Sequence, residues 1–354
     1  VQGLVASRYA EQVTSVDINP RAIRFSRFNA QLNGILNIQI RLGSLYEPIG
    51  ERTFDTILAN PPFVPSPNSD LRFRDGGNTG EDILAAIIRG SSDHLTAKGR
   101  LFVVTDLVNV PEYQTKLSSW WTGGKVDQLI LCTADRDEML FSVPHSHAPF
   151  GQAYEDYTRE LNDWLTNFQA ASLKAVNFGY ILIEKTVSSQ SGSYYVRTIH
   201  NPTQPIHEQV KDYFWQRNLL RGQDFLTRYL VLNPDLQFRI EETLSGEQKT
   251  VEVFSPDNPY FTTYQINSDV HRLLKEINYL QPEWHSIATP GNKAWIEELL
   301  HKGILSLKSR PRSTNPEKQT ANNRPKVEAN KASPGIVELR TKTTPTCLSA
   351  YLAQ

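Results

Sequence analysis

The chain has 354 residues, a net charge of −1 and 39% hydrophobic residues, and this length predicts two or three domains. The near-zero net charge gives no global argument for nucleic-acid binding, and the sequence contains neither an apolar run long enough to span a membrane nor a recognisable signal peptide. Its two cysteines, Cys132 and Cys347, are too few for a disulfide framework or a cysteine metal site. We therefore expect a cytoplasmic protein without a bound metal.

Strand and helix patterns alternate through the first half of the chain. Short apolar or β-branched runs predict strands over 12–17, 38–42, 54–59, 100–106, 126–132 and 178–185. Helical spacing predicts helices over 1–10, 20–33, 81–95, 111–121 and 161–176. The charged stretch 135–160 interrupts the alternation as an insertion. The order of elements predicts an α/β fold with a doubly wound sheet over residues 1–187.

The second half has a different composition. A serine-rich stretch at 188–193 marks a boundary. Residues 194–307 mix helical and strand patterns, so we expect a smaller accessory α+β domain, and its last helix, Gly303 and short strand resemble the end of a winged helix. From residue 308 to 354 the sequence is polar, rich in lysine and interrupted by prolines, which predicts a disordered tail.

The segment FDTILANPPF, Phe54–Phe63, carries the clearest functional signal. Its first six residues are typical of a buried parallel strand. The strand must end at the two prolines, because proline cannot donate to a sheet ladder. Asn60, Pro61, Pro62 and Phe63 are therefore expected at the carboxyl end of a central strand, the edge of an α/β sheet where ligands bind.

This motif suits methyl transfer to a planar NH2 group. The side-chain oxygen of Asn60 and the backbone carbonyl of Pro61 could each accept a hydrogen bond from the acceptor nitrogen, and both bonds would strengthen as positive charge develops. Phe63 could stack on the flat acceptor. No general base is required, because the nitrogen becomes acidic only as the methyl bond forms. A plain proline turn after a buried strand is the alternative interpretation.

Polar residues also follow two other predicted strands. A carboxylate at Asp17 can accept hydrogen bonds from both hydroxyls of a ribose, although it could instead cap the following helix. Ser44 and Leu45 could hold an adenine ring, or simply form a turn. In a parallel sheet these strand ends and the motif at Asn60 would face one crevice.

The segments TSVDINPRAIRFSRFNAQLNG, GSLYEP, FDTILANPPFVPSP and RFRDGGNTGEDILAAII together resemble class I S-adenosylmethionine-dependent methyltransferases. More narrowly, residues 1–186 are similar to a bacterial multidomain subgroup of the protein-glutamine N5-methyltransferases that modify translation release factors. The resemblance implies a Rossmann-like methyltransferase sheet and S-adenosyl-L-methionine as cofactor. It also implies roles for individual residues: cofactor binding by Gly3, Asp17, Ile18, Ser44, Leu45 and Asn60, and acceptor binding by Asn60, Pro61, Pro62 and Phe63.

Two departures from that family pattern matter. The family's first strand and glycine-rich loop would lie before Val1, where only the tail of the loop around Gly3 remains, so the resemblance implies an N-terminally truncated sheet. Many relatives also have an acid at the position of Ser44, so adenine recognition would depend on backbone groups.

The leading hypothesis is an N-methyltransferase whose acceptor is a protein glutamine amide. One alternative acceptor is the exocyclic amine of adenine or guanine in RNA or DNA, which would make the protein a nucleic-acid methyltransferase. A second alternative is a catalytically inactive binding module, because the glycine-rich loop is absent. The sequence predicts no membrane partner and no particular oligomeric state.

Overall fold

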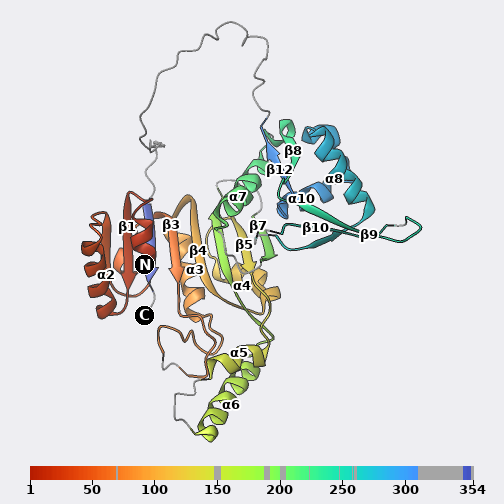
Figure 1. Ribbon diagram of the computed structural model, residues 1–354. Coiled ribbons are helices and arrows are strands. Elements are labelled where there is room, and N and C mark those ends of the chain that lie inside the picture. The colour runs from red at the N-terminus through yellow and green to blue at the C-terminus, as the bar shows by residue number, and fades with distance from the viewer. Residues whose placement is uncertain are drawn as a thin grey trace, which may run out of the picture.

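A computed structural model describes residues 1–68, 71–146, 153–186, 192–199, 205–222, 224–246, 248–256, 258, 261–309 and 346–351. An eight-stranded sheet crosses the molecule in the order β2-β1-β13-β3-β4-β6-β5-β7 (Figure 1). Its strands are β1 (Gln12–Asp17), β2 (Ile38–Leu42), β3 (Phe54–Asn60), β4 (Leu95–Val108), β5 (Val126–Cys132), β6 (Val176–Lys185), β7 (Ser193–Thr198) and β13 (Thr346–Tyr351). In this order, β2, β1, β13, β3 and β4 are parallel to one another, whereas β6 is antiparallel to both β4 and β5.

Helices connect the strands as the sequence predicts for an α/β fold. They are α1 (Gln2–Ala6), α2 (Pro20–Leu32), α3 (Asp82–His94) and α4 (Tyr113–Trp120), with short 3-10 turns at Glu47–Ile49 and Val110–Glu112. The helix α2 begins after Asn19, whose side chain accepts a hydrogen bond from the backbone N–H of Arg21. The apolar face of α3 packs with β3 and β4 in one buried cluster that includes Leu84 and Ile87. The predicted α/β class is confirmed.

Most predicted boundaries agree with the structure, and one helix is displaced. The strands predicted over 12–17, 38–42 and 126–132 have those bounds in the structure. The helix predicted over 161–176 instead spans Tyr154–Ala170, because Val176 already begins β6. The expected N-terminal helix ends at Ala6 rather than Ala10.

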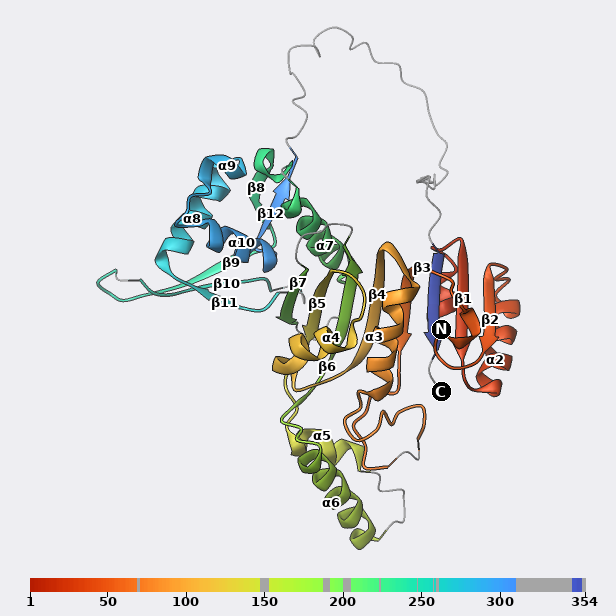
Figure 2. The same cartoon turned by 180° about the vertical axis from the view of Figure 1, so that it is seen from behind.

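The insertion is a pair of helices beside the end of the sheet. It comprises α5 (Glu138–His145) and α6 (Tyr154–Ala170). Figures 1 and 2 show the pair below the sheet, on the same side as the loop that follows β3. A small buried cluster that contains Phe141 and Trp164 from the helices and Val64 from the loop fixes this contact.

The expected start of the accessory domain at Tyr194 is too early. Residues 193–198 form β7, which pairs in parallel with β5 as the edge strand of the large sheet. The elements that follow are α7 (His207–Arg221), a 3-10 turn (Asp224–Thr227), β8 (Tyr229–Leu232), β9 (Gln237–Glu242), β10 (Gln248–Phe254), β11 (Tyr264–Ile266), α8 (Ser268–Leu280), α9 (Trp284–Ile287), α10 (Lys293–His301) and β12 (Leu305–Lys308). Here β9, β10 and β11 form an antiparallel sheet, and β12 pairs with β8. Their core is continuous with Leu129, Leu131 and Leu182 of the large sheet.

The tail also departs from the sequence-based expectation. Disorder is the wrong prediction for Thr346–Tyr351, which form β13 between β1 and β3 and pair in parallel with both. The position between β1 and β3, where the family's first strand was expected to be missing, is therefore occupied by β13. The physical reason is that β13 satisfies backbone N–H and C=O groups that β1 and β3 would otherwise leave unpaired in the middle of the sheet. The rest of the predicted tail, 310–345 and 352–354, lies outside the described residues.

Within the described residues, no helix combines the length and the apolar character needed to cross a bilayer.

Candidate active site

The structure brings three predicted site positions to one edge of the sheet. Asp17 ends β1, Ser44 follows β2 closely, and Asn60 ends β3. In the strand pairing, Asp17 is opposite Leu42 of β2, and Asn60 is opposite Tyr351 of β13. Only β13 separates β1 from β3, so the backbones at Asp17 and Asn60 are roughly 10 Å apart, two strand spacings. These positions therefore share the carboxyl edge of the parallel strands.

Asp17 is a buried carboxylate with one unsatisfied oxygen. Asp17 is 3% exposed, and its Oδ1 accepts a hydrogen bond from the backbone N–H of Asn19 at 2.7 Å. Among the described residues Oδ2 has no hydrogen-bond partner. Burial raises the pKa of this carboxyl group, and the bond from Asn19 opposes that rise. An acceptor in this state is suited to a ligand that brings hydroxyl donors.

The turn after β2 is tied to the same strand end. The backbone N–H of Gly43 donates to the carbonyl of Asp17 at 3.0 Å, which holds Ser44 and Leu45 next to it. Leu45 has a left-handed backbone (φ 47°) and packs against the buried cluster to which α3 contributes. Ile18 is 57% exposed beyond Asp17. Gly3 is a buried residue of α1, which packs beside β1 and β13.

The proline motif is held rigidly by its own loop. Asn60 is exposed, Pro61 and Pro62 are buried, and Phe63 is half-buried. The backbone N–H groups of Phe63 and Val64 donate to the carbonyl of Arg74 at 3.1 and 2.9 Å.

The returning part of the same loop packs on the motif. Gly80 has φ +74°, and a Cβ there would collide with the carbonyl oxygen of Phe63. Asp75 is buried and pairs with Arg74 at 2.7 Å, and Arg74 also lies over the Trp164 ring of α6. The loop therefore fixes the motif against the α5–α6 pair.

A buried ion pair that sequence analysis did not identify lies on the neighbouring strand. Asp106 of β4 is 3% exposed, and its Oδ1 accepts from Arg136 Nη2 at 2.6 Å. Burial raises the pKa of Asp106 to about 6, although the Arg136 guanidinium acts in the opposite direction. Asp106 is the last residue of the strand predicted over 100–106, so its place at a strand end could have marked it as a candidate site residue. Its partner is 30 residues away in the sequence, where no local pattern marks it.

A second polar group joins the loop to α4. Glu81 accepts hydrogen bonds from the Tyr113 hydroxyl at 2.8 Å and from Lys116 Nζ at 2.9 Å. Lys116 also donates to the carbonyl of Val108 at the end of β4. Burial raises the pKa of Glu81, and Lys116 is the largest opposing influence. This group anchors the start of α3 directly after the motif loop.

Comparison with known proteins relates the first third of the chain to methyltransferases. Residues 2–120 match the model of the family described as "Methyltransferase small domain". The chain is 31% identical over 103 residues to the release factor glutamine methyltransferase of Geobacter sulfurreducens, which covers 26% of this chain and 36% of that protein. It is 30% identical over 100 residues to the ribosomal protein uL3 glutamine methyltransferase of Bradyrhizobium diazoefficiens, which covers 25% of this chain and 31% of that protein.

A third relative has no assigned activity. The chain is 33% identical over 90 residues to the Bacillus subtilis protein named "Uncharacterized protein YbxB", which covers 25% of this chain and 38% of that protein. The chain thus spans between about three-tenths and four-tenths of the length of the relatives named here. The matched segment contains all the predicted site residues, from Gly3 to Phe63. The similarity therefore concerns the strands that carry the candidate site.

Proposed function

We propose that this chain is an S-adenosylmethionine-dependent N-methyltransferase whose acceptor is the side-chain amide of a protein glutamine. The observation that carries the proposal is the buried Asp17 carboxylate, with Oδ2 unpartnered among the described residues, at the same sheet edge as Asn60 and Phe63. The match of residues 2–120 to a methyltransferase family model supports the cofactor class. Two relatives named as glutamine methyltransferases support the acceptor.

Each predicted residue has a defined task in this proposal. Asp17 accepts the ribose hydroxyls of the cofactor, and Ile18, Ser44, Leu45 and Gly3 complete the cofactor side. The bound cofactor supplies the methyl group. Asn60 and the Pro61 carbonyl orient the acceptor NH2 group, and Phe63 stacks on its plane. Pro62 is buried and keeps the backbone of the motif in place.

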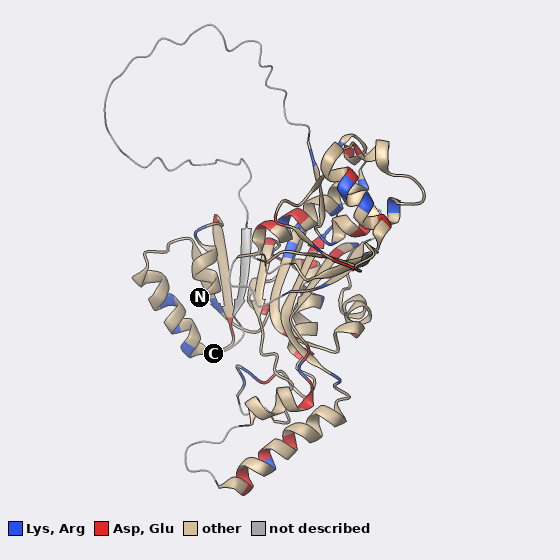
Figure 3. Ribbon diagram, turned by 45° about the vertical axis from the view of Figure 1, so that its right-hand side comes forward, with Lys and Arg blue, Asp and Glu red and all other residues tan. Residues whose placement is uncertain are grey.

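One feature favours a nucleic-acid acceptor as the second candidate. The helix α2, which begins three residues after Asp17, exposes Arg21, Arg24 and Arg27 together with the rings of Phe25 and Phe28. Figure 3 shows the basic residues along this helix. Arginine and aromatic side chains on one surface are typical of single-stranded nucleic-acid binding. The exocyclic amine of adenine or guanine is also a planar NH2 group, so the motif alone does not separate the two acceptors.

Cofactor binding is tested by titration calorimetry of the full chain with S-adenosyl-L-methionine. We expect saturable binding that Asp17→Ala weakens by about 100-fold, since each hydrogen bond to a charged group contributes about 1.5–3 kcal/mol. The control is Asp269→Ala, which removes an exposed aspartate of α8 and should leave the affinity unchanged. No binding to the folded wild-type chain would overturn the cofactor assignment.

The acceptor is tested by transfer of a labelled methyl group to a glutamine-containing release-factor protein or to single-stranded RNA. We expect label in the protein and a fall of about 100-fold in rate for Asn60→Ala, a change larger than its effect on cofactor affinity. Label in RNA that is lost in an Arg21→Ala, Arg24→Ala double variant would instead identify the nucleic-acid acceptor. Cofactor binding without transfer to either acceptor would favour the binding-module hypothesis.

A further inference from the structure

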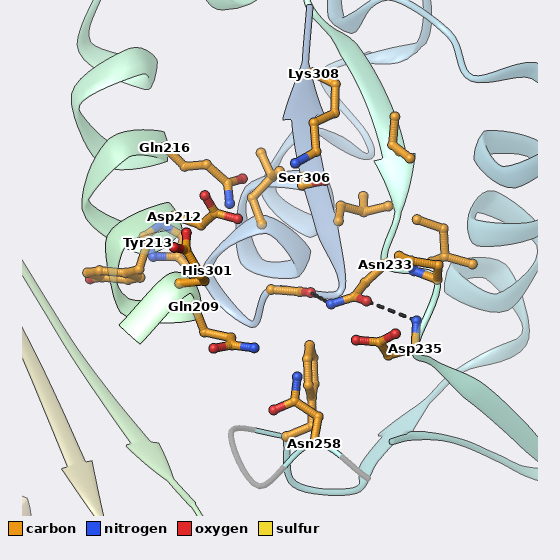
Figure 4. A pocket seen from close by; sticks show the side chains of 18 of the residues that line it. Gln209, Asp212, Tyr213, Gln216, Asn233, Asp235, Asn258, His301, Ser306 and Lys308 are labelled. Carbon is orange, nitrogen blue, oxygen red and sulfur yellow. Dashed lines mark hydrogen bonds between the residues drawn. The ribbon is translucent and has the colours of Figure 1, made fainter. Parts of the chain in front are cut away.

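A cavity separate from the strand-end site lies among residues of β7 and the elements that follow it. It has a volume of about 260 Å³ and is enclosed by α7, α10, β12 and the turn after β8 (Figure 4). No residue of the strand-end site lines it. Ligand sites for drug-sized molecules span about 300–1,000 Å³, so this cavity suits a single small ring.

Amide side chains form part of the polar lining. Figure 4 shows Gln209 and Gln216 of α7 and Asn258 pointing into the same space. Gln216 is only 6% exposed, yet its Oε1 has no hydrogen-bond partner among the described residues, and the same holds for Oε1 of Gln209. Buried amides without partners are uncommon in folded proteins, which indicates that a ligand or water completes them. Each amide can both donate and accept.

The imidazole of His301 adds a neutral group to the same wall. Burial, followed by the nearby Arg217, lowers the pKa of His301 to about 4, so the ring is uncharged at neutral pH. Nη1 of Arg217 lies 2.5 Å from Nε2 of His301. A guanidinium can only donate, so Nε2 accepts and the ring proton resides on Nδ1. That buried Nδ1–H has no hydrogen-bond partner among the described residues.

The charges around the cavity nearly cancel. The carboxylates of Glu208, Asp212 and Asp235 line it together with the cations Arg197 and Lys308. Arg197 donates to the carbonyl of His301 and is 2% exposed, so it is already engaged in the wall. A strongly anionic ligand would face the carboxylates, and a strongly cationic one would face both basic side chains. The lining favours an uncharged ligand that both donates and accepts hydrogen bonds.

We propose that this cavity binds one hydroxylated sugar ring, either as a free monosaccharide or as the ribose of a nucleoside. Hydroxyl groups both donate and accept, which matches amides, carboxylates and the Nδ1–H of His301 in one lining. A sugar ring also has an apolar C–H face, and Phe261, Leu300 and Leu305 provide an apolar part of the lining. The proposal is independent of the methyl-transfer function, because no residue is shared between the two sites.

Saturation-transfer NMR on the full chain tests the proposal with ribose, glucose, adenosine and arginine amide as separate probes. We expect signal from the sugars or from adenosine. Gln216→Leu should weaken it at least 10-fold, and Asp212→Ala, which changes an exposed side chain, should weaken it several-fold. The matched control Gln31→Leu replaces an exposed helical glutamine of α2 and should bind as the wild type does. Circular dichroism confirms that each variant is folded.

The outcomes separate the sources of the ring. Adenosine that binds more tightly than ribose and loses affinity in Gln216→Leu identifies a nucleoside in this cavity, because adenosine held at the proposed cofactor site would not respond to that variant. Glucose or ribose binding at least as tightly identifies a free sugar. Binding of arginine amide alone would show a cation pocket and overturn the proposal. It is equally overturned if no hydroxylated probe binds the folded wild type, which leaves a water-filled cavity, or if no hydroxylated probe loses affinity in either Gln216→Leu or Asp212→Ala.

Discussion

At the end of β1, the Asp17 carboxylate is in a state that folding alone does not favour. Its Oδ2 atom is buried without a hydrogen-bond partner among the described residues, and burial raises its pKa. An unsatisfied buried polar atom costs about 1–3 kcal/mol. Residues that break a local rule of folding in this way are expected at functional sites. The same side chain therefore links the stability of β1 to the proposed recognition of a ribose.

Asp106 makes a pH-dependent contribution to stability that can be measured. Its folded pKa of about 6 lies above the ordinary aspartate pKa of 3.8, so the native state binds this proton more tightly than the unfolded chain does. The stabilisation is therefore complete below about pH 4 and is lost as the pH rises through 6. Arg136→Gln removes the cation that offsets the buried charge. We expect destabilisation of about 3 kcal/mol at pH 8 and much less at pH 5, because the protonated carboxyl no longer needs the cation.

Urea unfolding of the wild type and the variant at both pH values checks this expectation. The control is Arg159→Gln, which breaks an exposed pair with Asp156 in α6 and should change stability by no more than about 0.5 kcal/mol. An Asp106→Asn, Arg136→Gln double variant should recover most of the loss at pH 8. A loss of equal size at both pH values would contradict the ion-pair argument.

At the scale of the element, the loop from Pro61 to Gly80 holds the motif through its own backbone. Gly80 is left-handed and packs against the Phe63 carbonyl, whereas Gly34 is left-handed with open space around its Cα. Gly34→Ala should therefore lower the free energy of unfolding only by the cost of placing alanine in a left-handed backbone, about 1–2 kcal/mol. Gly80→Ala should cost more than this and also displace Phe63. We expect it to abolish methyl transfer while Gly34→Ala keeps it, as measured by urea unfolding and label transfer. Equal behaviour of the two variants would show that the loop does not position the motif.

Sequence patterns identify the elements whose partners are nearby in the chain. The strands ending at Asp17 and Asn60 were predictable because β-branched runs and the two prolines mark them locally. The α8 helix is likewise marked locally, since Asn267 provides a cap before a strongly amphipathic segment. The role of β7 could not be predicted, because its partner β5 is separated from it by the insertion and β6. The ion pair between Asp106 and Arg136 could not be predicted for the same reason, since its two residues are far apart in the sequence.

At the scale of the whole molecule, both halves of the chain share one folded unit. Leu129, Leu131 and Leu182 of the large sheet are buried together with side chains of α7, α8 and α10. Arg221 of α7 forms an ion pair with the buried Asp127 of β5. Removing the region after β7 would therefore expose apolar surface and an unpaired carboxylate on the sheet. The α/β sheet and the accessory elements are expected to unfold in one transition.

The place of β13 makes the end of the sequence part of the sheet that holds the candidate site. Each N–H along Cys347–Ala350 faces β1 or β3, since the strand pairs with both. Proline at Ser349 removes one of these donors in a central strand, where proline is not tolerated. We expect Ser349→Pro to lower the free energy of unfolding by about 1–3 kcal/mol, since a ladder partner is left unsatisfied, and to weaken cofactor binding, because β1 and β3 carry Asp17 and Asn60. Ser349→Ala keeps the N–H and should behave as the wild type does. Urea unfolding with calorimetry on both variants measures this, and a proline variant as stable as the alanine variant would mean that the sheet does not depend on its last strand.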